Sequence, residues 1–382
     1  MGSAGITDSF AGGIMFGIIL LSAGTLMHIY VIWRASSVPF VNRLVPRKLL
    51  IGIGILLWGG FLSARVFGHG GTGGLAAAME LFGMTWMAAL FLASVSLLAM
   101  DLLTGFGFFF PRLAPSLRGW ALVASGVFCV IALIQGLRPP VVEKYEVGIA
   151  GLPNEMNGLV LAAMSDLHLG SLLGKQWLEG RVAQVQALRP DLVVLLGDVF
   201  EGHGRPQAEL LPVLGRLSAP LGVWAVPGNH EFHGGRENSM PLFGETSIQV
   251  LRNRWAEVRP GLVLVGVDDL TAKRGAAQEG DFITQAFAGR PPGATILLSH
   301  KPSQAEKAAS LGARLMLCGH THGGQVWPFG YLVQFVYPLL DGQHEVDGMT
   351  VIVCRGTGTW GPRMRLWRPG EILLVTLRGE KK

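Results

Sequence analysis

Histidine and acidic side chains recur at the ends of apolar runs in the second half of this chain. The run 314–318 leads directly into Gly319, His320, Thr321 and His322. Two histidines one residue apart on such a turn can direct their ring nitrogens into one cleft, and glycine lets a metal ion or phosphate approach the backbone closely. By itself this pair could equally be two exposed loop histidines.

Four segments upstream share this design, because each places Asp, Asn or His directly after an apolar run. They are Ser165-Asp166-Leu167-His168, Gly197-Asp198-Val199-Phe200-Glu201, Pro227-Gly228-Asn229-His230-Glu231 and Ser299-His300-Lys301-Pro302. α/β sheets place ligand sites at the carboxyl ends of their strands, so we expect these groups to converge. Mixed imidazole and carboxylate ligands suit Mn, Fe or Zn better than Mg or Ca. Two such ions about 3.5–4 Å apart can bind a phosphate ester and generate hydroxide at neutral pH.

The five segments together resemble the motifs of the calcineurin-like metallophosphoesterases. The family pattern of DxH, GDxx(D/E), GNH(E/D), a lone His and GHxH occurs here in full and in order. Within the family, the chain looks most like the bacterial exported or membrane-anchored phosphodiesterases. The resemblance runs from about Leu159 to the C-terminus and implies an α/β fold, a four-layer α/β/β/α sandwich with two divalent metal ions at one sheet edge.

The resemblance also implies a role for each residue of the site. The ligands would be Asp166, His168 and His322 for one metal, Asn229, His300 and His320 for the other, and Asp198 as the bridge between them. A bridging hydroxide would attack phosphorus in line. His230 would meet the phosphoryl oxygen or the leaving group as a catalytic cation or acid, and Glu231 would orient His230.

Several further polar residues are candidates for substrate binding. His203 and His233 lie just beyond two of the metal motifs, where they could touch substrate or be solvated loop histidines. Arg355 follows an apolar run, and its guanidinium could bind a phosphate with two hydrogen bonds, the alternative being a surface charge cluster. Asp268 and Asp269 could face the cleft or simply form a turn.

The first part of the chain predicts a membrane anchor. Four apolar runs have the length needed to cross a bilayer, at residues 10–33, 49–67, 81–103 and 120–137. We therefore expect a four-helix transmembrane region over residues 1–138, a linker and entry strand over 139–158, and one catalytic domain over 159–382. Arg65, Glu80 and Asp101 lie near span ends, so we expect them to snorkel to water and the bundle to anchor rather than transport.

The charge distribution predicts the orientation of this anchor. Four of the five net positive charges fall within residues 1–150, between apolar runs, so the basic balance gives no reason to expect nucleic-acid binding. Arginine and lysine lie in the loops after the first and third runs, whereas the N-terminal tail and residues 68–74 have none. The positive-inside rule then predicts a multi-pass protein of the cytoplasmic (inner) membrane with its catalytic domain on the extracytoplasmic side.

We expect a membrane-anchored, metal-dependent phosphoesterase (a phosphodiesterase or phosphatase) whose substrate could be a lipid. One alternative is a pyrophosphohydrolase of a nucleotide-linked lipid such as UDP-2,3-diacylglucosamine, which related metallophosphoesterases cleave. Another is a membrane receptor or transporter whose soluble domain only binds metal or phosphate. The apolar stretch 326–340, directly after the GHTH turn, could be core, a covered hairpin, or a loop that contacts the bilayer.

Overall fold

The structure is a computed structural model that describes residues 4–68, 73–201, 209–232, 239–269 and 281–379, with side chains from residue 17 onward. By its internal contacts the chain divides into two compact units. The helical unit comprises Gly12–Leu137 and Gly361–Trp367. The catalytic unit comprises Arg138–Trp360 and Arg368–Lys382, together with Met1–Ala11.

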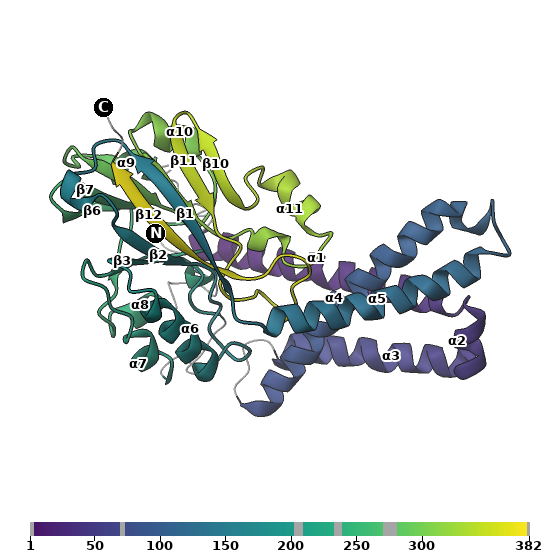
Figure 1. The fold of residues 1–382 in the computed structure, drawn as a ribbon. Coiled ribbons are helices and arrows are strands. Elements are labelled where there is room, and N and C mark those ends of the chain that lie inside the picture. The colour runs from purple at the N-terminus through teal and green to yellow at the C-terminus, as the bar shows by residue number, and fades with distance from the viewer. Residues whose placement is uncertain (1–3, 69–72, 202–208, 233–238, 270–280, 380–382) are drawn as a thin grey trace. The chain divides into compact units, whose positions relative to one another are not determined.

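The helical unit is built from four long apolar helices and one short one (Figure 1). These are α1 (Ala4–Ala35), α2 (Pro39–Leu44), α3 (Arg47–Ser63), α4 (Gly74–Leu103) and α5 (Ala114–Leu137). Four stretches are long and apolar enough to cross a membrane: Gly17–Ala35, Arg47–Gly68, Gly74–Leu103 and Ala114–Leu137. Each predicted span overlaps one of them.

Asp101 does not reach water as the sequence predicted, because it is fully buried within the helical unit. The Nε atoms of Arg34 on α1 and Arg118 on α5 lie 2.6 and 2.7 Å from its two carboxylate oxygens. The Tyr30 hydroxyl donates a third contact to it at 2.7 Å. A charge inside an apolar bundle is tolerated when it is paired in this way, so the expectation of snorkelling is wrong for Asp101. Instead, these contacts tie together the ends of three helices.

Two six-stranded sheets form the centre of the catalytic unit. The first has the strand order β1 (Val141–Ile149), β12 (Glu371–Gly379), β2 (Val160–Met164), β3 (Leu192–Leu196), β4 (Val223–Val226) and β5 (Gln249–Val250). The second has the order β10 (Gly342–Val346), β11 (Met349–Val353), β9 (Leu315–Cys318), β8 (Ala294–Leu298), β7 (Leu262–Gly266) and β6 (Arg254–Arg259). Strands β2 to β5 are parallel in the first sheet, as are β7, β8, β9 and β11 in the second.

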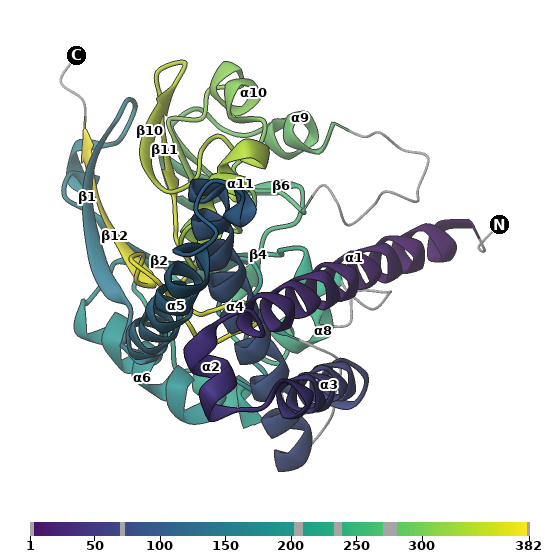
Figure 2. The same cartoon turned by 90° about the vertical axis from the view of Figure 1, so that its right-hand side faces the viewer.

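The apolar residues of these strands fill three layers of core. Leu161, Leu196, Ile296 and Leu317 belong to one buried cluster that draws on both sheets, so the sheets pack face to face. The opposite face of the first sheet packs against α6 (Lys175–Ala187) and α7 (Leu211–Leu214), with α8 (Met240–Phe243) beside them. The outer face of the second sheet packs against α9 (Phe282–Phe287) and α10 (Ala305–Ser310) (Figure 2). The predicted α/β/β/α sandwich is therefore confirmed.

Candidate metal centre

The predicted ligands all follow strands whose carboxyl ends meet at one place. Asp166 and His168 come directly after β2, Asp198 after β3, and Asn229 after β4, three neighbouring parallel strands of the first sheet. His300 follows β8, and His320 and His322 follow the adjacent β9 of the second sheet. The face-to-face packing of the sheets brings these two sets of loops together.

The side chains form three overlapping groups whose possible ligand atoms lie within 4.8 Å of one another. The groups are Asp166, His168 and His322; His168, Asp198 and His230; and Asp198, His300 and His320. In the first group, the Nε2 atoms of His168 and His322 are 3.1 Å apart, and His322 Nε2 is 3.4 Å from Asp166 Oδ1. In the third, His300 Nε2 is 3.1 Å from Asp198 Oδ2. Asp198 thus lies between the other members of the set.

Two buried oxygens that make no hydrogen bond within the described part of the chain support the fit of this set to metal ions. Asp166 Oδ1 and Asn229 Oδ1 are both buried and have no hydrogen-bond partner among the described residues. A buried polar atom without a partner is costly, and in native proteins it calls for a specific explanation such as a bound ion. Both atoms belong to predicted ligands and carry the lone pairs that a divalent cation needs, so the donor set fits Mn, Fe or Zn.

The backbone at the ligands is held in a conformation that non-glycine residues seldom adopt. Five of the seven predicted ligands have positive φ angles: Asp166 (55°), His168 (44°), Asp198 (50°), His320 (73°) and His322 (51°). Each such residue costs about 1–3 kcal/mol and persists only where the surrounding structure enforces it. This concentration of strain at one point is typical of a functional site.

Two glycines leave room for the central carboxylates. A Cβ atom on Gly319 would lie 1.8 Å from Ser165 Oγ and 2.5 Å from Asp166 Oδ2. A Cβ atom on Gly228 would lie 2.2 Å from Asp198 Oδ1. The loops after β4 and β9 therefore approach the carboxylates so closely that any side chain there would displace them.

His230 carries a positive charge at neutral pH in this arrangement. Glu201 Oε2 lies 2.8 Å from His230 Nδ1 and 2.5 Å from His168 Nδ1. Burial opposes the charged imidazole, but the carboxylates of Glu201 and Asp198 outweigh it and raise the pKa of His230 to about 9. His230 Nε2 lies 3.9 Å from Asp198 Oδ2. A charged donor at this position can meet an anionic ligand held by the cluster.

Comparison with known proteins also supports a metal centre formed by these residues. The profile of the calcineurin-like phosphoesterases matches residues 159–324, which include all seven predicted ligands. An uncharacterized metallophosphoesterase of Aquifex aeolicus is 34% identical over 242 residues, covering 63% of this chain and 92% of that protein. The chain belongs to the calcineurin-like metallophosphoesterases.

Other relatives of this metallophosphoesterase are named as transmembrane proteins. A "Transmembrane protein with metallophosphoesterase domain" of Danio rerio is 33% identical over 270 residues, covering 68% of this chain. The chain spans 62% of the length of that relative. A solved dimetal phosphatase of Danio rerio covers 53% of this chain and 88% of its own at 16% identity, with a TM-score of 0.33, a likeness too low to bear on function.

Glu231 occupies a different position in the metallophosphoesterase from the one predicted. Its fully buried carboxylate accepts backbone N–H groups of Asp198, Val199, Phe200 and Gly228 at 2.7–3.1 Å. Glu231 therefore holds together the loops after β3 and β4, and the carboxylate that lies 2.8 Å from Nδ1 of His230 is that of Glu201. Glu201 closes the GDxx(D/E) motif, which is the sequence signal that could have identified it.

The third group, Asp198, His300 and His320, has a partner that the motifs do not contain. His320 Nδ1 faces His300 Nε2 at 3.2 Å, while its Nε2 lies 3.0 Å from the hydroxyl of Tyr337. Burial opposes a charge on His300, but Asp198 outweighs it and raises its pKa to about 10. Burial and the charge on His300 lower the pKa of His320 to about 3. Tyr337 lies 15 residues after His322, outside any motif spacing, so only the structure brings it to the site.

The predicted substrate-binding residues lie in different surroundings. His203 and His233 fall outside the described residues. Arg355 lies beside the GHTHGG turn, since a Cβ on Gly323 would be 3.0 Å from its Cγ. Its Nη2 atom contacts Glu371 at 2.5 Å and Glu143 at 2.8 Å, so two carboxylates already hold this guanidinium.

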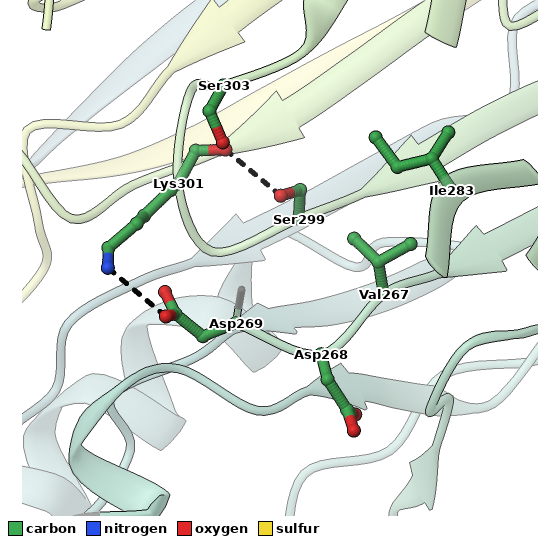
Figure 3. Close-up of a pocket in the computed structure, with 7 residues that line it drawn as sticks. All are labelled: Val267, Asp268, Asp269, Ile283, Ser299, Lys301 and Ser303. Atoms are coloured by element: carbon green, nitrogen blue, oxygen red, sulfur yellow. Dashed lines mark hydrogen bonds and ion pairs between the residues drawn. The ribbon is translucent and has the colours of Figure 1, made fainter. Parts of the chain in front are cut away.

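Asp268 and Asp269 line a small pocket next to the strand that carries His300. Figure 3 shows the Asp269 carboxylate directed at the amino group of Lys301, 3.1 Å away, and Asp268 turned away from it. Arg252 donates to both oxygens of Asp268 at 3.0 and 2.9 Å. Both aspartates are thus paired with cations beside the ligand loops.

Proposed function

We propose that this protein is a membrane-anchored phosphoesterase that hydrolyses phosphate esters at a centre of two divalent metal ions. The observation that carries the proposal is Asp198, whose carboxylate belongs to two of the three ligand groups. Asp166, His168 and His322 would hold one ion, and Asn229, His300 and His320 the other. Two ions held in this way neutralise the phosphoryl oxygens and lower the pKa of water, which supplies the nucleophile.

The residues around the ions would position the ester and move a proton. Glu201 accepts from Nδ1 of His230 and so leaves the Nε2–H of that imidazole directed toward the cluster. From there His230 would donate to a phosphoryl oxygen or to the leaving-group oxygen. Glu231 would keep the loops after β3 and β4 in register, so that Asp198 and His230 hold their separation.

Two substitutions test the metal assignment. Asp198→Ala should lose metal and activity together, because one carboxylate serves both ions. His230→Ala should keep both metals and slow turnover by about 10²–10⁴-fold, the usual contribution of a positioned acid or base. Elemental analysis and turnover of an aryl phosphodiester are measured on both variants. Full metal content in Asp198→Ala would refute the shared carboxylate.

We also propose that the catalytic unit lies on the extracytoplasmic side of the cytoplasmic membrane. Arg43 on α2, Arg47 and Lys48 at the start of α3, and Arg112 between α4 and α5 are exposed, and basic residues near the ends of spans favour the cytoplasmic side. The substrate range on that side would include lipid phosphoesters rather than nucleotide-linked precursors, which are made on the cytoplasmic face. Alkaline phosphatase and a fluorescent protein fused to the C-terminus report the side directly. Activity of the cytoplasmic reporter alone would favour the pyrophosphohydrolase instead.

A further inference from the structure

The catalytic unit exposes its large apolar side chains almost entirely on one short segment. Seven large hydrophobic side chains are exposed in the described part of this unit, and six of them form what we term the apolar patch: Trp327, Phe329, Tyr331, Leu332, Phe335 and Val336. Phe335 is 91% exposed. The seventh residue is Val141, on β1. Core packing and a covered hairpin, two readings left open by the sequence, therefore do not describe these six side chains, whereas Val326 and Leu340 at the ends of the stretch 326–340 are buried.

The patch has the composition of a membrane contact. Most of it lies on α11 (Gly330–Val336), which has no buried residue. Residues 325–340 contain no Lys, Arg, Asp or Glu. Soluble surfaces seldom expose a contiguous apolar patch unless it contacts a partner or a membrane. Protein interfaces usually carry a polar rim, whereas aromatic and leucine side chains together are typical of a segment lying in the bilayer interface.

The patch is directly attached to the metal centre. A Cβ on Gly324, at the end of the GHTHGG turn, would lie 2.1 Å from Cα of Gly330, where α11 begins. Tyr337 follows the last residue of α11, and its hydroxyl lies 3.0 Å from Nε2 of the ligand His320. Whatever surface the patch binds is therefore held next to the metal ligands.

A short connection to a helix that could span a membrane keeps this patch near a bilayer. Helix α5, which is long and apolar enough to span a membrane, ends at Leu137, and β1 of the catalytic unit begins at Val141. A fully extended chain reaches at most about 3.3–3.6 Å per residue, so this connection is short. The catalytic unit is therefore tethered close to the membrane that α5 enters.

We propose that the apolar patch inserts into the interface of this bilayer, so that the metal centre acts on phosphoesters of lipids in the adjoining leaflet. The docking element is α11 with Trp327 and Phe329 before it. The substrate class rests on the proposed phosphoesterase function, whereas the docking does not.

A fluorescence experiment tests the docking without catalysis. The full chain, with the half-buried Cys129 replaced by Ala, carries an environment-sensitive fluorophore at Phe335→Cys and is reconstituted into phosphatidylcholine vesicles with brominated acyl chains. Arg259→Cys is the matched control, because it is exposed at the β6–β7 turn, at the opposite ends of the parallel strands from the ligands. We expect bromine to quench the probe at 335 and leave the probe at 259 unquenched. Equal quenching at both, or no quenching together with disulfide crosslinking of the unlabelled Phe335→Cys protein between copies, would overturn the proposal.

A second experiment tests the lipid substrate. Hydrolysis of a vesicle phospholipid is compared with that of a water-soluble aryl phosphodiester for Leu332→Ser with Phe335→Ser, and for Val141→Ser as the control. The ratio of lipid to soluble activity should fall about tenfold or more in the patch variant, since burial of two large apolar side chains is lost. It should stay at the wild-type value in Val141→Ser. Equal loss on both substrates would overturn lipid delivery, whereas hydrolysis of neither by the wild type would refute the phosphoesterase function and leave the quenching result to decide docking.

Discussion

Glu231→Gln should destabilise the catalytic unit much more than one charge at its surface would. The carboxylate of Glu231 accepts four backbone N–H groups with no exposure to solvent. A glutamine keeps one acceptor oxygen and turns its NH₂ group toward donors, so about two of the four bonds are lost. Burial and the neighbouring Asp198 raise the pKa of Glu231, so these bonds do not count as bonds to a full charge. A buried N–H left without a partner costs about 1–3 kcal/mol, which predicts a loss of about 2–6 kcal/mol for two of them. The whole free energy of unfolding of a domain is only about 5–15 kcal/mol.

The assay is thermal unfolding of the full chain in detergent, with metal content and turnover measured in parallel. For a unit of this size, 1 kcal/mol corresponds to about 2–4 °C, so Tm should fall by about 10 °C. Glu345→Gln is the matched control, because Glu345 is exposed and, within the described part of the chain, accepts only the Thr350 hydroxyl. Its Tm should stay close to the wild-type value. A Glu231→Gln protein with unchanged Tm, full metal content and strongly reduced turnover would refute the backbone role and restore Glu231 as the partner of His230.

Three further predictions follow from the site. Glu201→Gln removes the carboxylate that outweighs burial at His230, so the pKa of His230 falls and the alkaline limb of the rate–pH profile should move down by about one to three units; an unmoved limb would exclude His230 as the acid. Gly319→Ala should expel metal, seen by elemental analysis, because its Cβ meets Ser165 at 1.8 Å, whereas Gly180→Ala has open space and should keep it. Chelation should lower Tm by about 5–10 °C, since metal at 100 times its Kd stabilises by about 2.7 kcal/mol; an unchanged Tm would contradict a metal centre in the folded state.

The ligand loops could be predicted from sequence because each follows its own buried strand. The motif spacing carries both the strand and the residue at its end, as with Asp198 after β3 and His320 after β9. Their convergence then follows from the rule that ligands bind at the carboxyl ends of parallel strands. Helices long enough to span a bilayer were predictable for a similar reason, since length and hydropathy are local properties.

Contacts between distant segments could not be predicted in this way. Glu231 is adjacent to His230 in sequence, whereas Glu201 belongs to the preceding motif, and only the path of the loops decides which carboxylate reaches the imidazole. Tyr337 reaches His320 because α11 folds back onto the GHTHGG turn. Asp101 looks like a residue at a span end until Arg34 and Arg118 are placed around it. Each of these contacts depends on the tertiary structure, because no local sequence pattern determines which distant side chain lies next to a given residue.

The pairing of β1 with β12 has a consequence for how the protein is made. All nine residues of β1, Val141–Ile149, are in register with Glu371–Gly379, and β12 also separates β1 from β2. During synthesis, β1 therefore has no neighbouring strand until β12 has left the ribosome. Because such long-range pairing is slow, the anchor helices can enter the membrane while the sheet is still open. Loss of β12 would leave β1 without its neighbour, so a ribosome that stops before Glu371 should yield a membrane-inserted chain with an unfinished sheet, a substrate for quality-control proteases.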